Sequence, residues 1–82
     1  MKTIPLTIIY QTKTVTHHIS ELQIETIAGI RSILPGHEPL YAALKHNSKV
    51  SLTRSDNKTE EVQVLDGIAI IDRESIKIIL SE

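Results

Sequence analysis

Apolar residues recur at every second position over the first ten residues of the chain. Ile4, Leu6, Ile8 and Tyr10 alternate with mostly polar neighbours. Side chains at this spacing share one face of a strand, so the pattern predicts a strand here. Pro5 has no N–H to donate to a ladder. We therefore expect either an edge strand or a residue 5 that points outward.

A second alternating segment follows, and it contains one irregular step. Ile19, Leu22 and Ile24 are its apolar positions, and Thr26 continues their phase. The three-residue step from Ile19 to Leu22 is most simply explained by a β-bulge. The pattern predicts one long strand from about Val15 to Thr26, bent so that it serves both sheets of a sandwich.

The second half of the chain consists of short alternating segments separated by turn residues. Val50 and Leu52, and then Val62 and Val64, flank a polar hairpin tip at residues 54–58. Asp66-Gly67 predicts a further reversal, because Asp-Gly is a strong hairpin signal.

The segments at the end of the chain are apolar and short. Residues 68–71 are apolar on both faces, residues 72–74 form a turn, and residues 76–80 alternate again. Leu40–Leu44 is too short to assign to a strand or a helical turn. Short strands at regular spacing predict an all-β fold: one small antiparallel β-sandwich or barrel over residues 1–82.

Composition narrows the possible functions of this domain. The chain has no cysteine, an aromatic content of 2% and a formal net charge of −1. It therefore lacks thiolate ligands, stacking platforms and a basic surface, and we expect no nucleic-acid partner. No apolar run approaches the roughly 20 residues of a membrane span, and the first residues do not resemble a signal peptide. We expect a cytoplasmic protein that does not insert into the membrane.

The histidines and glycines do not assemble a catalytic, metal or cofactor site. His17 and His18 are adjacent in a strand and point to opposite faces, so we expect solvent-facing histidines rather than metal ligands. His37 follows a Pro-Gly pair, where its ring can bond local backbone, contact a partner or act as a base; no nucleophile accompanies it. Three glycines cannot build a phosphate-binding loop. We expect no catalytic residue and no cofactor.

Several apolar residues fall outside the alternating set. If that set fills the core, Ile9, Leu65, Ile71 and Ile79 project to the opposite faces, and Ile27 and Ile30 add to this excess. Roughly 25 cal/mol is gained for each Å² of apolar surface removed from water. A contiguous group of these residues predicts a docking surface for another protein.

The segment Ile33-Leu34-Pro35-Gly36-His37-Glu38-Pro39-Leu40 is the most specific feature of the sequence. Pro35-Gly36 fits the central pair of a type II turn. With the apolar run that follows it and the later Val64–Ile70 segment, it resembles the N-terminal β-sandwich of the ε subunit of F-type ATP synthases. The resemblance covers essentially the whole chain in order.

This resemblance implies a non-catalytic subunit of the central stalk. In that family the domain docks on the γ subunit, touches the c-ring through loops and turns with them, so it would be coupled only indirectly to the catalytic α/β head. The likeness assigns the γ-facing side to His37, Glu38, Pro39, Leu40, Ile68 and Ile71. It places the loop Gly29, Ile30, Arg31 and Ser32 nearest the ring. On this basis Ile71→Asp should abolish γ binding and leave the fold intact.

Three departures from the family pattern matter. The family usually ends in a helical hairpin, whereas this sequence ends at Glu82, so we expect neither inhibition nor ATP binding by such a hairpin. Ile30-Arg31 stands where the family's ring-facing loop generally carries an acidic residue beside glycine. Leu65-Asp66-Gly67 replaces a pair of small residues before the next apolar strand. The alternatives are an ε-like subunit of a specialised F-type-like motor not engaged in ATP synthesis, and a free-standing β-sandwich adaptor.

Overall fold

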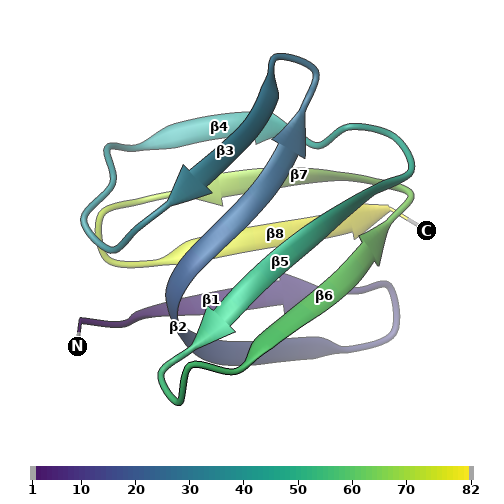
Figure 1. Ribbon diagram of the computed structural model, residues 1–82. Coiled ribbons are helices and arrows are strands. Elements are labelled where there is room, and N and C mark those ends of the chain that lie inside the picture. Colours follow the sequence, from purple (N-terminus) through teal and green to yellow (C-terminus); the bar gives the residue numbers. More distant parts are fainter. Residues whose placement is uncertain (1, 82) are drawn as a thin grey trace.

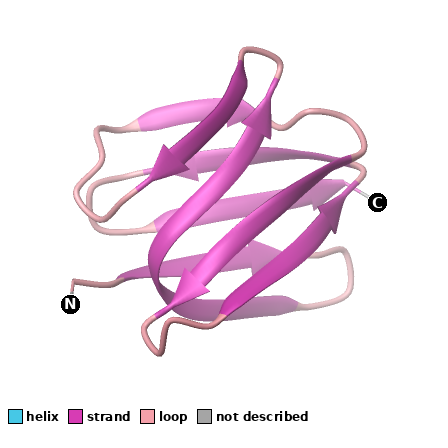
Figure 2. Ribbon diagram, viewed as in Figure 1, coloured by secondary structure: helices cyan, strands magenta, loops and turns pink. Residues whose placement is uncertain are grey.

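The computed structural model describes residues 2–81, and every regular element in that range is a β-strand (Figure 2). The strands are β1 (Ile4–Ile9), β2 (Thr14–Thr26), β3 (Gly29–Ile33), β4 (Leu40–Ala43), β5 (Ser48–Arg54), β6 (Thr59–Val64), β7 (Asp66–Ile71) and β8 (Ile76–Ser81). The expected all-β fold is confirmed.

The strands form one continuous sheet that curls so that its two halves face each other. The order is β4-β7-β8-β1-β2-β5-β6, and β3 pairs with β2 beside this path. Figure 1 shows β3, β5, β6 and part of β2 in front, with β4, β7, β8 and β1 behind them. The neighbours β1 and β8 run parallel, and the remaining pairs are antiparallel.

Strand β2 belongs to both layers, as its length predicted. Its first half pairs with β1, from Thr14 to Ile19, and its second half pairs with β3 and β5. The register with β5 shifts between Ile19 and Glu21, which confirms the bulge. The extra residue bends the strand, so Ile19 and Leu22 both point into the space between the layers.

The core is aliphatic and lies between the two layers. It consists of the inward side chains Ile4, Leu6, Ile8, Ile19, Leu22, Ile24, Ile33, Leu44, Val50, Leu52, Val64, Ala69, Ile71, Ile76, Ile78 and Leu80. Tyr10, Leu40, Ala42 and Val62 are partly buried against it. The predicted alternating set therefore does fill the core.

The phase of β7 differs from the expectation. Ile71 is 1% exposed, so the prediction that it projects outward is wrong. In the ladder with β8, Ile71 lies opposite Ile76 and Ala69 lies opposite Ile78. Directly paired residues share a face, so the inward phase of β8 forces Ala69 and Ile71 inward.

Gly67 completes the inward side of β7. A β-carbon added at Gly67 would lie 2.8 Å from the carbonyl oxygen of Ile79 and 3.1 Å from the side chain of Leu80. The small inward residues Gly67 and Ala69 thus let β7 approach the core closely, while the larger Ile68 and Ile70 take the outward positions.

Two further expectations about β4 and β7 are settled by the ladders. Asp66-Gly67 is not a hairpin turn: it opens β7, and only Leu65 separates it from β6, so the chain passes there from one layer to the other. The segment Leu40–Ala43, left unassigned above, is strand β4 and pairs with β7.

The structure decides between the two placements that the sequence predicted for Pro5. Strand β1 lies between β8 and β2, so it is not an edge strand. Pro5 is in the outward phase of β1, and the parallel ladder with β8 starts at the next residue, Leu6. The parallel ladder between β1 and β8 therefore loses no hydrogen bond because Pro5 lacks an N–H.

Candidate interaction surface

The outer face of the rear layer carries a contiguous apolar patch. We call this the outer patch and define it by its residues: Ile9, Tyr41, Ala43, Ile68, Ile70 and Ile79. They come from four neighbouring strands, β4, β7, β8 and β1. Isolated exposed apolar residues are ordinary, but a continuous group on one sheet face is typical of a docking surface.

The strand registers bring these side chains together in two rows. In the first row Ala43 pairs with Ile68, Ile68 with Ile79, and Ile79 with Ile9. In the second row Tyr41 pairs with Ile70. Cross-strand partners have β-carbons about 4.5–5.5 Å apart, so each row forms a continuous apolar surface.

The most exposed large side chain of the outer patch is that of Tyr41. Its side chain is 78% exposed, and those of Ile68 and Ile79 are 48% and 40% exposed. Aromatic residues that combine a large apolar ring with a hydroxyl are enriched at the energetic centres of protein interfaces. The patch ends at β2, where the outward residues Thr14 and Thr16 lie opposite Ile9 and Thr7.

The predicted signature loop leads directly into the patch. His37 N–H donates to the carbonyl oxygen of Leu34 over 3.1 Å, and Gly36 has φ +87°, so the predicted type II turn is confirmed. The ring of His37 lies with Nδ1 2.7 Å from the carbonyl oxygen of Glu38. Of the possibilities considered for His37, this contact favours a ring that fixes the loop.

The four signature residues proposed for the γ-facing side do not all face outward. Glu38 and Pro39 are exposed and His37 is half-buried, all beside the start of β4. Leu40 is partly buried against the core, because it pairs with the inward Ile71. Neither Leu40 nor Ile71 belongs to the outer patch, whereas Ile68 lies at its centre.

Sequence reasoning missed Tyr41, Ala43 and Ile70 as members of the patch. Tyr41 lies in a segment that was not assigned to a strand, and Ile70 lies in the strand whose phase was reversed. Alternation within Leu40–Ala43, had it been assigned to a strand, would have placed Tyr41 and Ala43 on one face. The outward positions of Ile9, Leu65 and Ile79 are confirmed.

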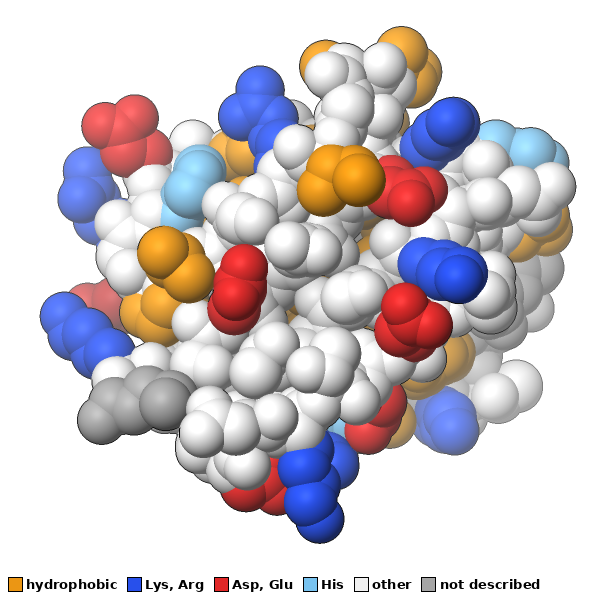
Figure 3. Space-filling model, viewed as in Figure 1, with side chains coloured by type: hydrophobic (Ala, Val, Ile, Leu, Met, Phe, Trp, Pro, Cys, Tyr) orange, Lys and Arg blue, Asp and Glu red, His pale blue; other side chains and the backbone are white. Residues whose placement is uncertain are grey.

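A second apolar feature is the tip of the β2–β3 hairpin. Ile27 and Ala28 form the turn, and Ile27 is 89% exposed. The hydroxyl of Thr26 accepts from the N–H of Ala28 and donates to the carbonyl oxygen of Gly29 over 2.9 Å. The tip is therefore held in one conformation, and hydrophobic side chains gather there at the top of Figure 3.

This geometry corrects the extent of the expected ring-facing loop. Gly29, Ile30, Arg31 and Ser32 are not a loop but most of strand β3. All four residues are exposed, with Ile30 at 68%. The true loop is the pair that precedes them.

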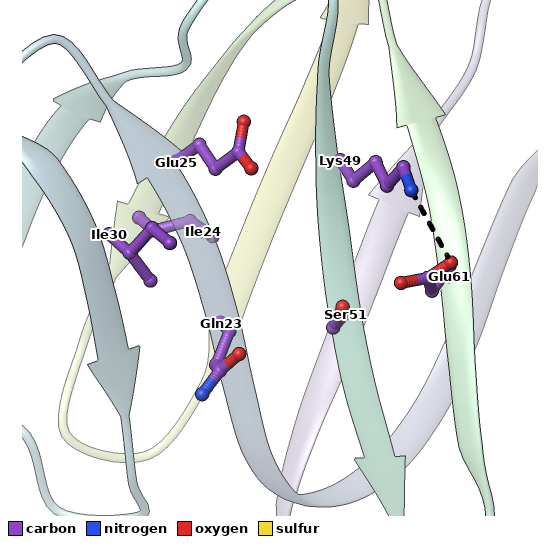
Figure 4. A pocket seen from close by; sticks show the side chains of 7 residues that line it. All are labelled: Gln23, Ile24, Glu25, Ile30, Lys49, Ser51 and Glu61. Carbon is purple, nitrogen blue, oxygen red and sulfur yellow. Dashed lines mark ion pairs between the residues drawn. The ribbon is translucent and has the colours of Figure 1, made fainter.

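The outer face of the front layer is polar by contrast. Figure 3 views this side and shows side chains of both charges dispersed over it. A shallow groove of about 220 Å³ is lined by Gln23, Ile24, Glu25, Ile30, Lys49, Ser51 and Glu61 (Figure 4). Lys49 of β5 and Glu61 of β6 pair on one side of it at 3.9 Å, with both side chains more than half exposed. Such a pair contributes little to stability.

A charged cluster lies where the two layers meet. His17 points inward from β2, and its Nε2 lies 3.8 Å from Glu60; Arg54 lies 3.3 Å from the other carboxylate oxygen. His17 is thus half-buried rather than solvent-facing, which corrects the expectation for this residue, whereas His18 is exposed. Within residues 2–81, no three His, Cys, Asp or Glu side chains are arranged to hold a metal ion.

Comparison with known proteins identifies the family. The sequence model described as "ATP synthase, Delta/Epsilon chain, beta-sandwich domain" matches residues 3–82. The chain belongs to this family. Residues 3–82 are therefore a β-sandwich domain of the ATP synthase δ/ε chain type, as the signature segment indicated.

A solved structure supports the fold of this δ/ε-type β-sandwich domain. The chain is similar to one in a cryo-EM structure of the Euglena gracilis mitochondrial ATP synthase (OSCP/F1/c-ring, rotational state 1), with a TM-score of 0.89 and 20% identity. The match covers 98% of this chain and 51% of that one, so the present chain spans about half its length. No curated protein matches in sequence. Among residues 2–81, no helix is long and apolar enough to span a membrane.

Proposed function

We propose that this protein is a non-catalytic ε-like subunit of the central stalk of an F-type rotary ATPase. It docks on the γ subunit and couples rotation between the catalytic head and its partner machinery, at the periphery of the membrane as part of a complex. The observation that carries the proposal is the outer patch, which offers apolar side chains from four strands on one face.

The outer patch fits this role better than the polar front face. A subunit that turns with a shaft must hold its partner through a stable contact, and burial of apolar area is the main driving force for such contacts. The front face offers dispersed charges, one exposed ion pair and the exposed Ile30 of β3 and, among residues 2–81, no row of apolar cross-strand partners. The γ-facing side is therefore the outer patch with the adjoining exposed residues Glu38 and Pro39.

The β2–β3 hairpin is the proposed second contact, directed towards the ring. Its tip presents Ile27, with Ile30 and Arg31 exposed on the strand behind it. In the family that the sequence resembles, the loop that faces the ring generally carries an acidic residue, whereas the tip in this chain is apolar. This difference favours the specialised motor as the second candidate. The two candidates share γ docking and differ in the partner at the hairpin.

Copurification from the organism's own cells tests the proposal. The full chain is tagged and isolated, and the intact complex is weighed by native mass spectrometry. We expect α, β and γ subunits to accompany it, with c-ring in a conventional synthase and without it in a specialised motor. Recovery of the chain with no ATPase subunit would contradict the proposal and favour the free-standing adaptor.

A further inference from the structure

We draw no further inference here: the strongest candidate, the group of exposed apolar side chains that Ile27, Ile30 and Leu34 form along the β2–β3 hairpin and the residue after it, carries nothing beyond the contact already proposed, because nothing in the structure shows what covers it.

Discussion

Ile68 and Ile79 lie directly opposite each other on β7 and β8, and both side chains remain exposed on the outer face. Burying both would remove substantial apolar area from water, yet the fold leaves them outside its own core. The inward neighbours Ala69 and Ile78, one position away, are fully buried. The domain therefore separates a core face from a second apolar face on the same strands.

The first prediction contrasts two isoleucines of β7. Ile71→Asp should prevent folding, because it places a carboxylate at a position that is 1% exposed, at a cost of several kcal/mol. Ile68→Asp should leave the unfolding midpoint within a few degrees of the wild type, because the new carboxylate stays in water. Thermal unfolding followed by circular dichroism measures both. A folded Ile71→Asp would contradict the assigned phase of β7.

The second prediction concerns the close approach at Gly67. Gly67→Ala should destabilise the domain by about 1–3 kcal/mol, because the new methyl group meets the Ile79 carbonyl oxygen at 2.8 Å and backbone must move. Gly67→Asn should cost more, since the side chain is larger. Denaturant unfolding gives both values, and an unchanged midpoint for Gly67→Ala would show that β7 and β8 are further apart.

The third prediction concerns Gly36, where the cost has a different origin. A β-carbon at Gly36 would meet nothing within 4 Å, but φ is +87°. Gly36→Ala should therefore cost about 1–2 kcal/mol through backbone strain alone. Gly36→Asn should recover part of that loss, because asparagine tolerates positive φ. Alanine should therefore destabilise the domain more than asparagine does at Gly36, and less than asparagine does at Gly67. The same order at both sites would contradict the separate explanations by backbone strain and by close packing.

The fourth prediction is a stabilising substitution in the core. The Ser48 hydroxyl is buried and has no hydrogen-bond partner among the described residues. Ser48→Ala removes this unsatisfied group and should stabilise the domain by roughly 1 kcal/mol. Ser51→Ala, at a half-buried outward position of the same strand, is the control and should change stability little. A loss of stability in Ser48→Ala would indicate that the hydroxyl is satisfied in solution.

Sequence periodicity predicted the strands whose two faces differ in polarity. Residues 4–8, 49–53 and 76–80 alternate clearly, and the structure buries the residues that the alternation assigns to the core. The bulge after Ile19 was also predictable, because the apolar step there is three residues rather than two. In these segments local pattern and tertiary packing agree.

The phase of β7 could not be obtained in the same way. Residues 68–71 are apolar at every position, so alternation gives no direction. The ladder with β8 and the close approach at Gly67 decide the phase, and both are long-range features. Because residues 68–71 show no alternation, the sequence-based prediction placed Ile71 on the docking surface and did not include Ile70.

The most direct test of the docking surface is the affinity of the full chain for the γ-like subunit of its own organism, measured by isothermal titration calorimetry. Ile68→Asp should weaken binding by at least about 30-fold, as expected for a central interface residue. Ile30→Asp, an equally drastic change at an exposed isoleucine of β3, should leave the affinity unchanged. Wild-type affinity in a folded Ile68→Asp would contradict the account.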